Sequence, residues 1–295
     1  MSSDRSLDRT PALGLVSVGA ISVQFGAALA TKLFHRVGPS GAVALRLVIA
    51  AVVLAGLAMI RDPRRSFAGI RSRDTHIAVL FGLALAAMNL SFYEAIDRIP
   101  LGVAVTIEFS GPLALALVGS RRLTDAAWAI LAGAGVALLA SGAGKGLDPA
   151  GLGLAGVAGA GWIAYILLSK ETGRRFDALP GLTIAMLAAA IVVLPAGIAS
   201  GGARLFDPGV LALGSLVAVL SSVVPYSLEL VALRQVTSRA FGVMLSLDPA
   251  VATAAGLAIL GQHLTDREWV ALALVVAANF GNSVAGSPGV VTTTP

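Results

Sequence analysis

The sequence predicts an all-α polytopic membrane protein whose ten transmembrane helices form two inverted five-helix repeats. Three observations support this prediction: a low content of charge, ten apolar runs of membrane-spanning length, and short motifs that recur 137 to 141 residues apart. Of the 295 residues, 57% are hydrophobic and 13% are charged, about half the charge of a typical soluble domain. The mean hydropathy of +0.88 agrees. Such a chain has too few polar side chains to cover a fold in water.

The composition also excludes several classes of function. The 34 glycines and the 5% of aromatic residues suit closely packed helices better than a β-barrel. The absence of cysteine excludes disulfides and thiolate metal sites, and the three histidines lie apart at predicted helix ends, so we expect no metal site. There is no P-loop, His-Glu-x-x-His or dinucleotide-binding motif. We therefore expect no catalytic residues and no cofactor.

Each apolar run approaches the roughly 20 residues that a membrane-spanning helix needs. Backbone polar groups in lipid must be satisfied within a segment, so the runs predict helices. For the first run a cleaved signal peptide is the alternative, because Ala28-Leu29-Ala30 resembles a peptidase site, but the length of the run favours a helix. The predicted helices cover 12–34, 41–60, 76–95, 101–119, 126–142, 151–170, 179–200, 208–233, 239–260 and 268–286.

Lysines and arginines in the connecting segments predict the orientation. If the N-terminus is cytoplasmic, 14 of the 21 fall on the cytoplasmic side and 6 on the other, with Arg46 inside the second helix. The positive-inside rule then places both termini on the cytoplasmic side of an inner membrane. The net charge of +5 thus reflects orientation in lipid and does not indicate a nucleic-acid partner.

An internal repeat divides the chain into two halves, 12–142 and 151–286. Because five helices are an odd number, the two copies cross the membrane in opposite directions, which in transporters places the substrate site near the midplane between them. A duplicated scaffold without transport activity is the alternative. The matching pairs are Leu123-Thr124-Asp125 with Leu264-Thr265-Asp266 (offset 141), Trp128 with Trp269 (141), Thr31-Lys32 with Ser169-Lys170 (138), and Pro112 with Pro249 (137).

Small residues recur every four positions on three predicted helices. Such stripes allow close helix contacts, either within the bundle or in a homodimer. They are Gly133-x-x-x-Ala137-x-x-x-Ser141, Gly156-x-x-x-Ala160-x-x-x-Ala164 and Ala273-x-x-x-Ala277-x-x-x-Gly281.

Ionisable residues inside predicted helices are the main site candidates, because a charge at the bilayer centre costs about 2.5–3.5 kcal/mol. Glu108 in the fourth helix and Asp248 in the ninth each lie within about one turn of a proline, Pro112 or Pro249. A proline removes a backbone donor and kinks the helix. An acid beside such a break could bind a proton or a substrate ammonium group. The alternative is a structural ion pair with Arg46, which could also hold a substrate carboxylate.

Polar stretches in the third and eighth helices are expected to border a central cavity, because these helices are repeat partners. The alternative for the aromatic residues is a role as interfacial anchors, which we favour for Trp128, Trp269 and Tyr93. The candidate residues are Asn89 and Tyr93 in the third helix, Tyr226 and Glu229 after the helix break at Pro225 in the eighth, and Trp162 and Gln24 elsewhere.

Several of these stretches match one known family along nearly the whole chain. They include Val43-Ala44-Leu45-Arg46-Leu47, Glu108-Phe109-Ser110-Gly111-Pro112, Gly161-Trp162-Ile163-Ala164-Tyr165, Leu220-Ser221-Ser222, Val224-Pro225-Tyr226-Ser227 and Asp248-Pro249-Ala250. The chain resembles the drug/metabolite transporter superfamily with two EamA-type domains, one per repeat, and within it the bacterial threonine/homoserine exporters. Gly261-Gln262 stands where that family usually has Gly-Glu, and Asp248 where its nearest members have Glu.

The resemblance implies a secondary exporter of small neutral amino acids such as threonine or homoserine, working by exchange for protons. Composition and spacing alone do not show that coupling. The same fold with other cargo is one alternative, and a non-transporting membrane scaffold is another.

Overall fold

The computed structural model describes residues 9–61, 72–118, 123–142, 146–176, 178–225, 228 and 246–285. Within these ranges the secondary structure is helical, with no strand. The elements are α1 (Arg9–Arg61), α2 (Ser72–Ile96), α3 (Leu101–Glu108), α4 (Ser110–Val118), α5 (Leu123–Ala140), α6 (Pro149–Arg175), α7 (Ala178–Gly201), η1 (Gly202–Phe206), α8 (Pro208–Ala218), η2 (Val219–Val223), α11 (Asp248–Leu260) and α12 (Asp266–Ala285).

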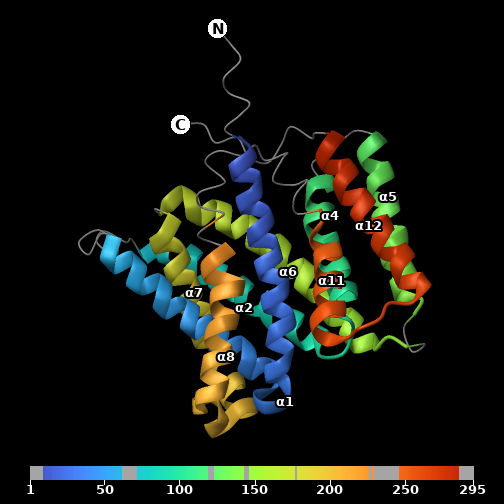
Figure 1. Cartoon of the computed structure of the whole chain (residues 1–295). Coiled ribbons are helices and arrows are strands. Elements are labelled where there is room, and N and C mark those ends of the chain that lie inside the picture. The colour runs from blue at the N-terminus through green and yellow to red at the C-terminus, as the bar shows by residue number, and fades with distance from the viewer. Residues whose placement is uncertain are drawn as a thin grey trace.

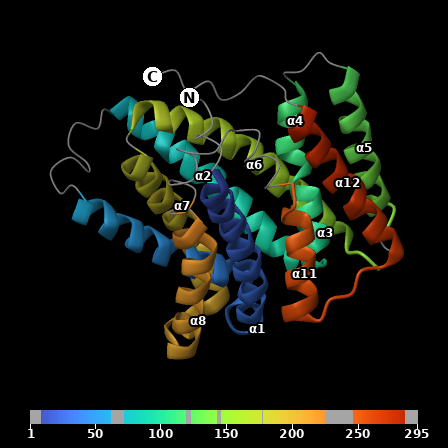
Figure 2. The same cartoon turned by 45° about the horizontal axis from the view of Figure 1, so that its top comes forward.

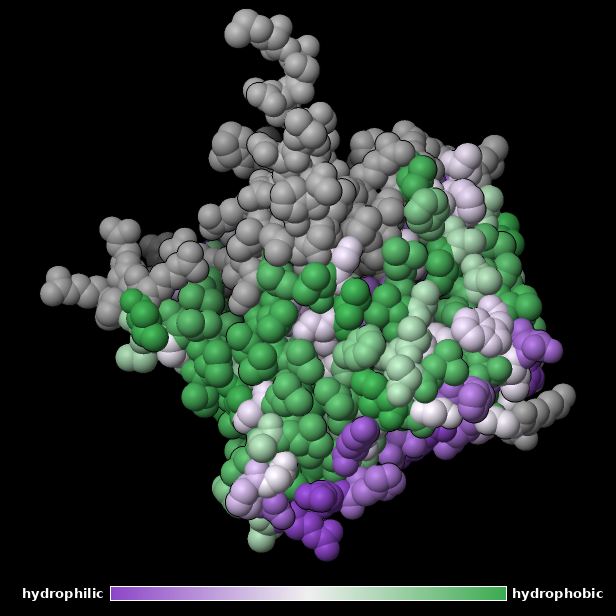
Figure 3. Space-filling view, in the orientation of Figure 1, coloured by the Kyte–Doolittle hydropathy of each residue, from purple (hydrophilic) through white to green (hydrophobic). Residues whose placement is uncertain are grey.

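Four helical spans in the described ranges are long and apolar enough to cross a membrane. They are Ser17–Ile60, Asp74–Ile96, Pro149–Arg175 and Leu179–Phe206. Large apolar side chains lie on the outside of the molecule, among them Ile60 (83% exposed) and Val118 (85% exposed). Figure 3 shows a broad hydrophobic face bounded at its lower edge by hydrophilic side chains. An apolar surface of this extent fits a lipid environment, as the composition predicts.

The first two predicted helices are the two halves of α1, which bends sharply at Gly38-Pro39. Gly38 has φ 69° and ψ 169°, a conformation that only glycine adopts readily. A Cβ at Gly38 would also lie 2.1 Å from the Ser200 hydroxyl oxygen of α7. That hydroxyl donates to the Val37 carbonyl at 2.8 Å, which ties α7 to the bend.

Two predicted helices depart locally from α-helical geometry near the prolines that the sequence identified as helix breaks. The run 101–119 is divided into α3 and α4 by a break at Phe109, and the run 208–233 changes from α8 to the π-helical turn η2. The cause lies a few residues ahead in each case, where Pro112 and Pro225 lack the N–H that an α-helix needs. By contrast, α7 continues through Pro195.

The Leu-Thr-Asp motif that marks the repeat has a structural role at a helix start. In the second copy, Glu268 Oε2 accepts from the Thr265 N–H at 2.7 Å, and Thr265 Oγ1 accepts from the Glu268 N–H at 3.4 Å. This reciprocal pair is a capping box, which satisfies N–H groups at the start of α12. The first copy has Ala127 in the position of Glu268 and therefore cannot form the same box.

The helices pack into one bundle in which α1 is central. It contacts α7, α8, η2 and α11, while α2 packs on α6 and α7, and α3 on α11 and α6. The pair α5 and α12 lies at one edge, side by side in both views (Figures 1 and 2). Glycines permit the closest approaches, since a Cβ at Gly102 of α3 would lie 2.1 Å from the Thr253 hydroxyl of α11.

Candidate functional site

Polar side chains are buried inside this apolar bundle, although burying them costs free energy unless they are paired. They come from α1, α2, α3, η2, α11 and the turn before α11, segments that are far apart in the sequence. The set comprises Ser22, Gln24, Arg46, Asn89, Thr106, Glu108, Ser221, Ser222, Ser246, Asp248 and Thr253. It contains Arg46 and both acids that the sequence identified as intramembrane charges.

Arg46, in the second half of α1, binds groups from two other elements. Its Nε donates to the Ser222 hydroxyl at 3.2 Å, its Nη1 to the Tyr93 hydroxyl at 3.2 Å, and its Nη2 to the Ser221 carbonyl at 3.1 Å. The guanidinium carbon also lies 5.6 Å from the centre of the Tyr93 ring, within the range of a cation–π interaction. The arginine thereby connects α1, α2 and η2.

The carbonyl of Ser221 is available to Arg46 because of the local backbone of η2. In an α-helix this carbonyl would accept from the N–H four residues later, but position 225 is proline and has none. The turn is π-helical instead, with the Val224 N–H donating to the Val219 carbonyl. Such π-turns are frequent at functional sites.

The same turn is held against the first half of α1. Ser22 Oγ donates to the Leu220 carbonyl at 2.7 Å. A Cβ at Gly26 would lie 2.2 Å from the Ser221 hydroxyl oxygen, so the absence of a side chain there allows the close approach. Both halves of α1 therefore contact η2.

Glu108 and Asp248 are both buried, at 7% and 5% exposure. Glu108 lies in the electrostatic field of Arg46, which attracts its carboxylate, and of Asp248, which repels it. Glu108 is the last residue of α3 and Asp248 the first of α11. The structure thus brings together the arginine and the two acids that the sequence singled out from helices two, four and nine.

The break after Glu108 is packed against α6. Pro112 provides no N–H for the Glu108 carbonyl, and a Cβ at Gly159 would lie 2.9 Å from that oxygen. The ring of Trp162 meets Phe109 edge-on, with 4.4 Å between ring centres. Trp162 therefore supports the backbone beside Glu108.

Asn89 and Tyr93 are both buried on α2, one turn apart. Asn89 donates to the Leu85 carbonyl of its own helix at 2.8 Å. Tyr93 is 0% exposed and packs against Phe34 and Phe92, so the interpretation of this residue as an interfacial anchor is wrong. The sequence alone does not show the role of a tyrosine near a helix end. The same residue type can anchor a helix at the membrane interface or bind a buried cation.

The two tryptophans of the repeat motif differ in their surroundings. Trp269 is 44% exposed on α12, as an anchor would be. Trp128 packs from α5 onto Gly281 of α12, where an added Cβ would lie 2.5 Å from the indole ring. Tyr226 and Glu229, the candidates in the eighth helix, lie outside the described residues, whereas Pro225 is buried at the end of the π-turn.

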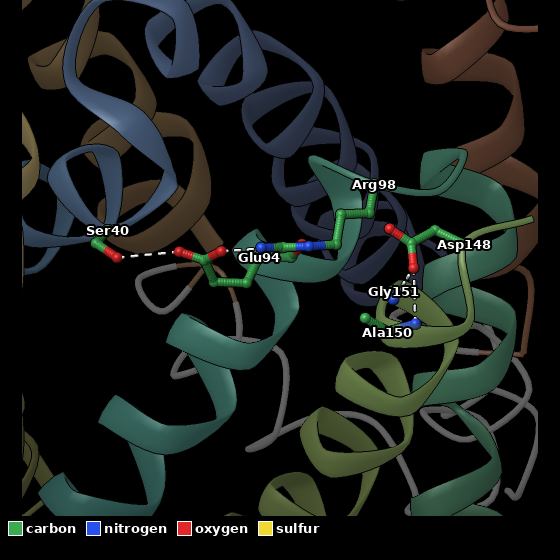
Figure 4. Close-up of polar contacts among 6 residues, drawn as sticks. All are labelled: Ser40, Glu94, Arg98, Asp148, Ala150 and Gly151. Carbon is green, nitrogen blue, oxygen red and sulfur yellow. Dashed lines mark hydrogen bonds and ion pairs between the residues drawn. The ribbon is translucent and has the colours of Figure 1, made fainter.

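A second polar cluster lies where α2 ends (Figure 4). Glu94 accepts from the Ser40 hydroxyl at 3.1 Å and pairs with Arg98 at 2.8 Å. The hydrogen bond from Arg98 to Glu94 raises the pKa of Arg98 above its ordinary value. Nearby, Asp148 accepts from the N–H groups of Ala150 and Gly151 and caps α6. These groups are partly exposed, so they fix helix ends and contribute little energy individually.

Sequence reasoning did not name three partners of the arginine region, Ser22, Ser221 and Ser222, as site candidates, although Ser221 and Ser222 lie in a stretch that carries the family resemblance. A weak signal was present, since two adjacent serines stand three residues before a proline in an apolar run, and Ser22 lies four residues before Gly26. Serine is common in membrane helices, so only the three-dimensional contacts identify these residues.

Comparison with known proteins gives consistent matches. The model of the EamA-like transporter family matches residues 149–284. The threonine/homoserine exporter RhtA of Salmonella typhimurium (strain SL1344) is 41% identical over 266 residues, which are 89% of this chain and 88% of the relative. The exporter RhtA of Escherichia coli (strain K12) is 38% identical over 273 residues, 92% of this chain and 90% of the relative.

The fold is also that of a solved crystal structure. It superposes with a TM-score of 0.59 at 20% identity and covers 94% of this chain and 98% of its own. At that identity the likeness concerns the fold alone.

Proposed function

Because the chain belongs to the EamA-like transporter family, we propose that it exports small neutral amino acids, foremost threonine and homoserine, in exchange for protons. The relatives at 38% and 41% identity carry the name threonine/homoserine exporter. The family is one of transporters and not of enzymes, so the buried polar groups are interpreted as a binding site.

One observation carries the proposal: a buried cation, Arg46, lies in the field of the buried acid Glu108, with Asp248 close by. A neutral amino acid is a zwitterion with one carboxylate and one ammonium group. The Arg46 guanidinium suits the carboxylate, since its planar fork matches two oxygens. Glu108 or Asp248 suits the ammonium group. Asn89 and Tyr226 are proposed to line the same cavity, and Tyr93, Glu229 and Trp162 to border it.

Exchange for protons follows from competition for one carboxylate. A proton and a substrate ammonium group cannot both neutralise the same acid, so protonation of Glu108 or Asp248 expels the substrate. A proton taken up from outside would thus release the amino acid there, and loss of that proton to the cytoplasm would restore the site. Such competition at a midplane site is sufficient for antiport if access alternates between the two sides.

We also propose that the chain forms ten transmembrane helices in two inverted repeats, 12–142 and 151–286. Helices that would be repeat equivalents pack on each other: α5 on α12, α3 on α11, and the second half of α1 on α7. The contact of α8 with the second half of α1 has an equivalent in that of α2 with α7. The break at Phe109 and the turn at Ser246–Leu247 are 137 residues apart, the same offset as Pro112 and Pro249.

Both termini are proposed to be cytoplasmic in a bacterial inner membrane, on the lysine and arginine distribution of 14 against 6. A homodimer is proposed as one arrangement of the protein in lipid. Its support is that Gly156, Ala160, Ala273 and Ala277 of the small-residue stripes are exposed on α6 and α12.

The decisive test is flux from purified protein in proteoliposomes with an imposed proton gradient. Labelled threonine and homoserine should cross the membrane in the direction opposite to the protons. Aromatic amino acids, sugar derivatives and cationic drugs, tested as a panel, should cross more slowly. Flux of another compound alone would overturn the amino-acid assignment. No flux of any compound would favour a scaffold, and gradient-independent flux would refute proton exchange.

A further inference from the structure

The π-turn η2 presents two neutral acceptors to one cation. Ser222 offers its hydroxyl to Arg46 Nε, and Ser221 offers its backbone carbonyl to Nη2. Ser222 is 0% exposed and Ser221 is 3% exposed. Neither residue carries charge, so the turn fixes the orientation of the guanidinium without neutralising it.

A guanidinium has five N–H donors in one plane, and it binds a carboxylate well only when its fork points at both oxygens. Hydrogen bonds at Nε, Nη1 and Nη2 give each of the three nitrogens a fixed partner, and so orient that plane. If one of these three hydrogen bonds is removed, fewer contacts hold the group on its flexible stem, and the direction of the fork is set less precisely.

We propose that Ser222 and the Ser221 carbonyl, exposed by Pro225, are positioning groups that aim Arg46 at the α-carboxylate of the transported amino acid. This inference rests on the proposed function, because it assumes that Arg46 receives that carboxylate. In this inference Arg46 supplies the charge that binds the carboxylate, and the backbone shape of η2 sets the direction of that charge.

The anchoring of the turn supports this role. Ser22 of the first half of α1 donates to the Leu220 carbonyl, and Gly26 allows the turn to lie directly against the same helix. The acceptors are therefore fixed to the half of α1 that does not carry Arg46. A shift between the two halves of α1 would change the aim of the guanidinium.

The test measures inhibition of labelled homoserine export in proteoliposomes by unlabelled homoserine and by its amino alcohol, which has a CH₂OH group in place of the carboxylate. In Ser222→Ala the inhibition constant of homoserine should rise about tenfold, since small misplacements of a recognition group have effects of at least this size. The inhibition constant of the amino alcohol should not change. A merely structural role would shift both constants together.

Pro225→Ala provides a second variant with the serine intact. The restored N–H at position 225 can bond to the Ser221 carbonyl and compete with Arg46 Nη2, so the inhibition constants should change in the same selective way. Thr183→Val is the matched control, because Thr183 is 0% exposed and its hydroxyl donates to the Leu179 carbonyl of its own helix, α7. It should change neither constant.

Equal changes for homoserine and the amino alcohol, or no change in either variant, would overturn the inference. Absence of homoserine flux in the wild-type protein would instead refute the proposed function, before any variant is compared. Thermal unfolding in detergent identifies a variant that fails to fold. If either Ser222→Ala or Pro225→Ala fails, the inhibition constants of the other variant test the inference.

Discussion

The Nη1 of Arg46 donates to the hydroxyl of Tyr93 at 3.2 Å, and the same guanidinium lies 5.6 Å from the centre of the tyrosine ring. The pair joins the second half of α1 to α2. Since Tyr93 is 0% exposed and Arg46 only 8%, both interactions occur in the interior of the bundle. The position of the cation is therefore coupled to the packing of α2.

Tyr93→Phe removes the hydroxyl and keeps the ring. We expect the free energy of unfolding to fall by about 1 kcal/mol, as for interhelical hydrogen bonds in membranes, and the substrate KM to rise several-fold. Thermal unfolding in detergent and efflux kinetics measure the two effects. Unchanged stability and KM would show that the Tyr93 hydroxyl is not needed to position Arg46, which keeps its hydrogen bonds to Ser221 and Ser222.

Arg46→Lys keeps the charge and removes the fork. A lysine cannot make three hydrogen bonds in fixed directions, so export at subsaturating substrate should fall by more than about tenfold while the protein still folds. Arg98→Lys is the control, because Arg98 is exposed and bonds to Glu94 at the end of α2. Equal export by the two variants would remove Arg46 from substrate binding.

Glu108→Gln tests the proton exchange. In the wild type, a more acidic cytoplasmic face should raise the apparent KM, because protons compete with substrate for the carboxylate. Glutamine does not titrate, so the KM of the variant should be higher and independent of pH, and proton-driven export should be lost. Efflux at several internal pH values measures this. Export at the wild-type rate and with the wild-type pH dependence would exclude this acid, and Asp248→Asn would then be the next variant.

The sequence predicted most of the helices because hydrophobic length is a local property. It located the breaks only approximately, since a proline reveals a missing donor but not whether the helix continues, as at Pro195, or changes to a π-turn, as before Pro225. The bend at Gly38 depends on contact with Ser200 of another helix, which no local pattern contains.

The charged residues of the candidate site could be predicted from the sequence, but the uncharged residues that bind them could not. A charge in an apolar run is unusual enough to identify Arg46, Glu108 and Asp248 without a structure. Ser221 and Ser222 belong to a common residue type, and their hydrogen bonds with Arg46 span 175 and 176 residues. Tyr93 was assigned to the interface for the same reason, because its burial depends on tertiary packing.

Gly111→Ala should destabilise the protein by about 1–3 kcal/mol, the usual range for overpacking. A Cβ at Gly111 would lie 2.1 Å from the backbone oxygen of Gly159 on α6, and backbone cannot move aside as a side chain can. Gly133→Ala is the matched control on α5, with no atom within 4 Å of the added Cβ. It should be neutral or slightly stabilising, since alanine favours helix. Similar unfolding curves for the two variants would contradict the close contact of α4 and α6.

The inverted repeat predicts that Arg36 and Arg174, which are 138 residues apart, lie on opposite sides of the membrane. They are equivalent under the offset of Thr31-Lys32 and Ser169-Lys170, and both are exposed at helix ends. Because the chain has no cysteine, Arg36→Cys and Arg174→Cys each introduce a single thiol. In spheroplasts, a membrane-impermeant maleimide should label Arg36→Cys at once and Arg174→Cys only after permeabilisation. A parallel duplication would label both or neither, and it would also remove the symmetry on which the proposed alternating access depends. The labelling pattern therefore tests the architecture independently of any transport assay.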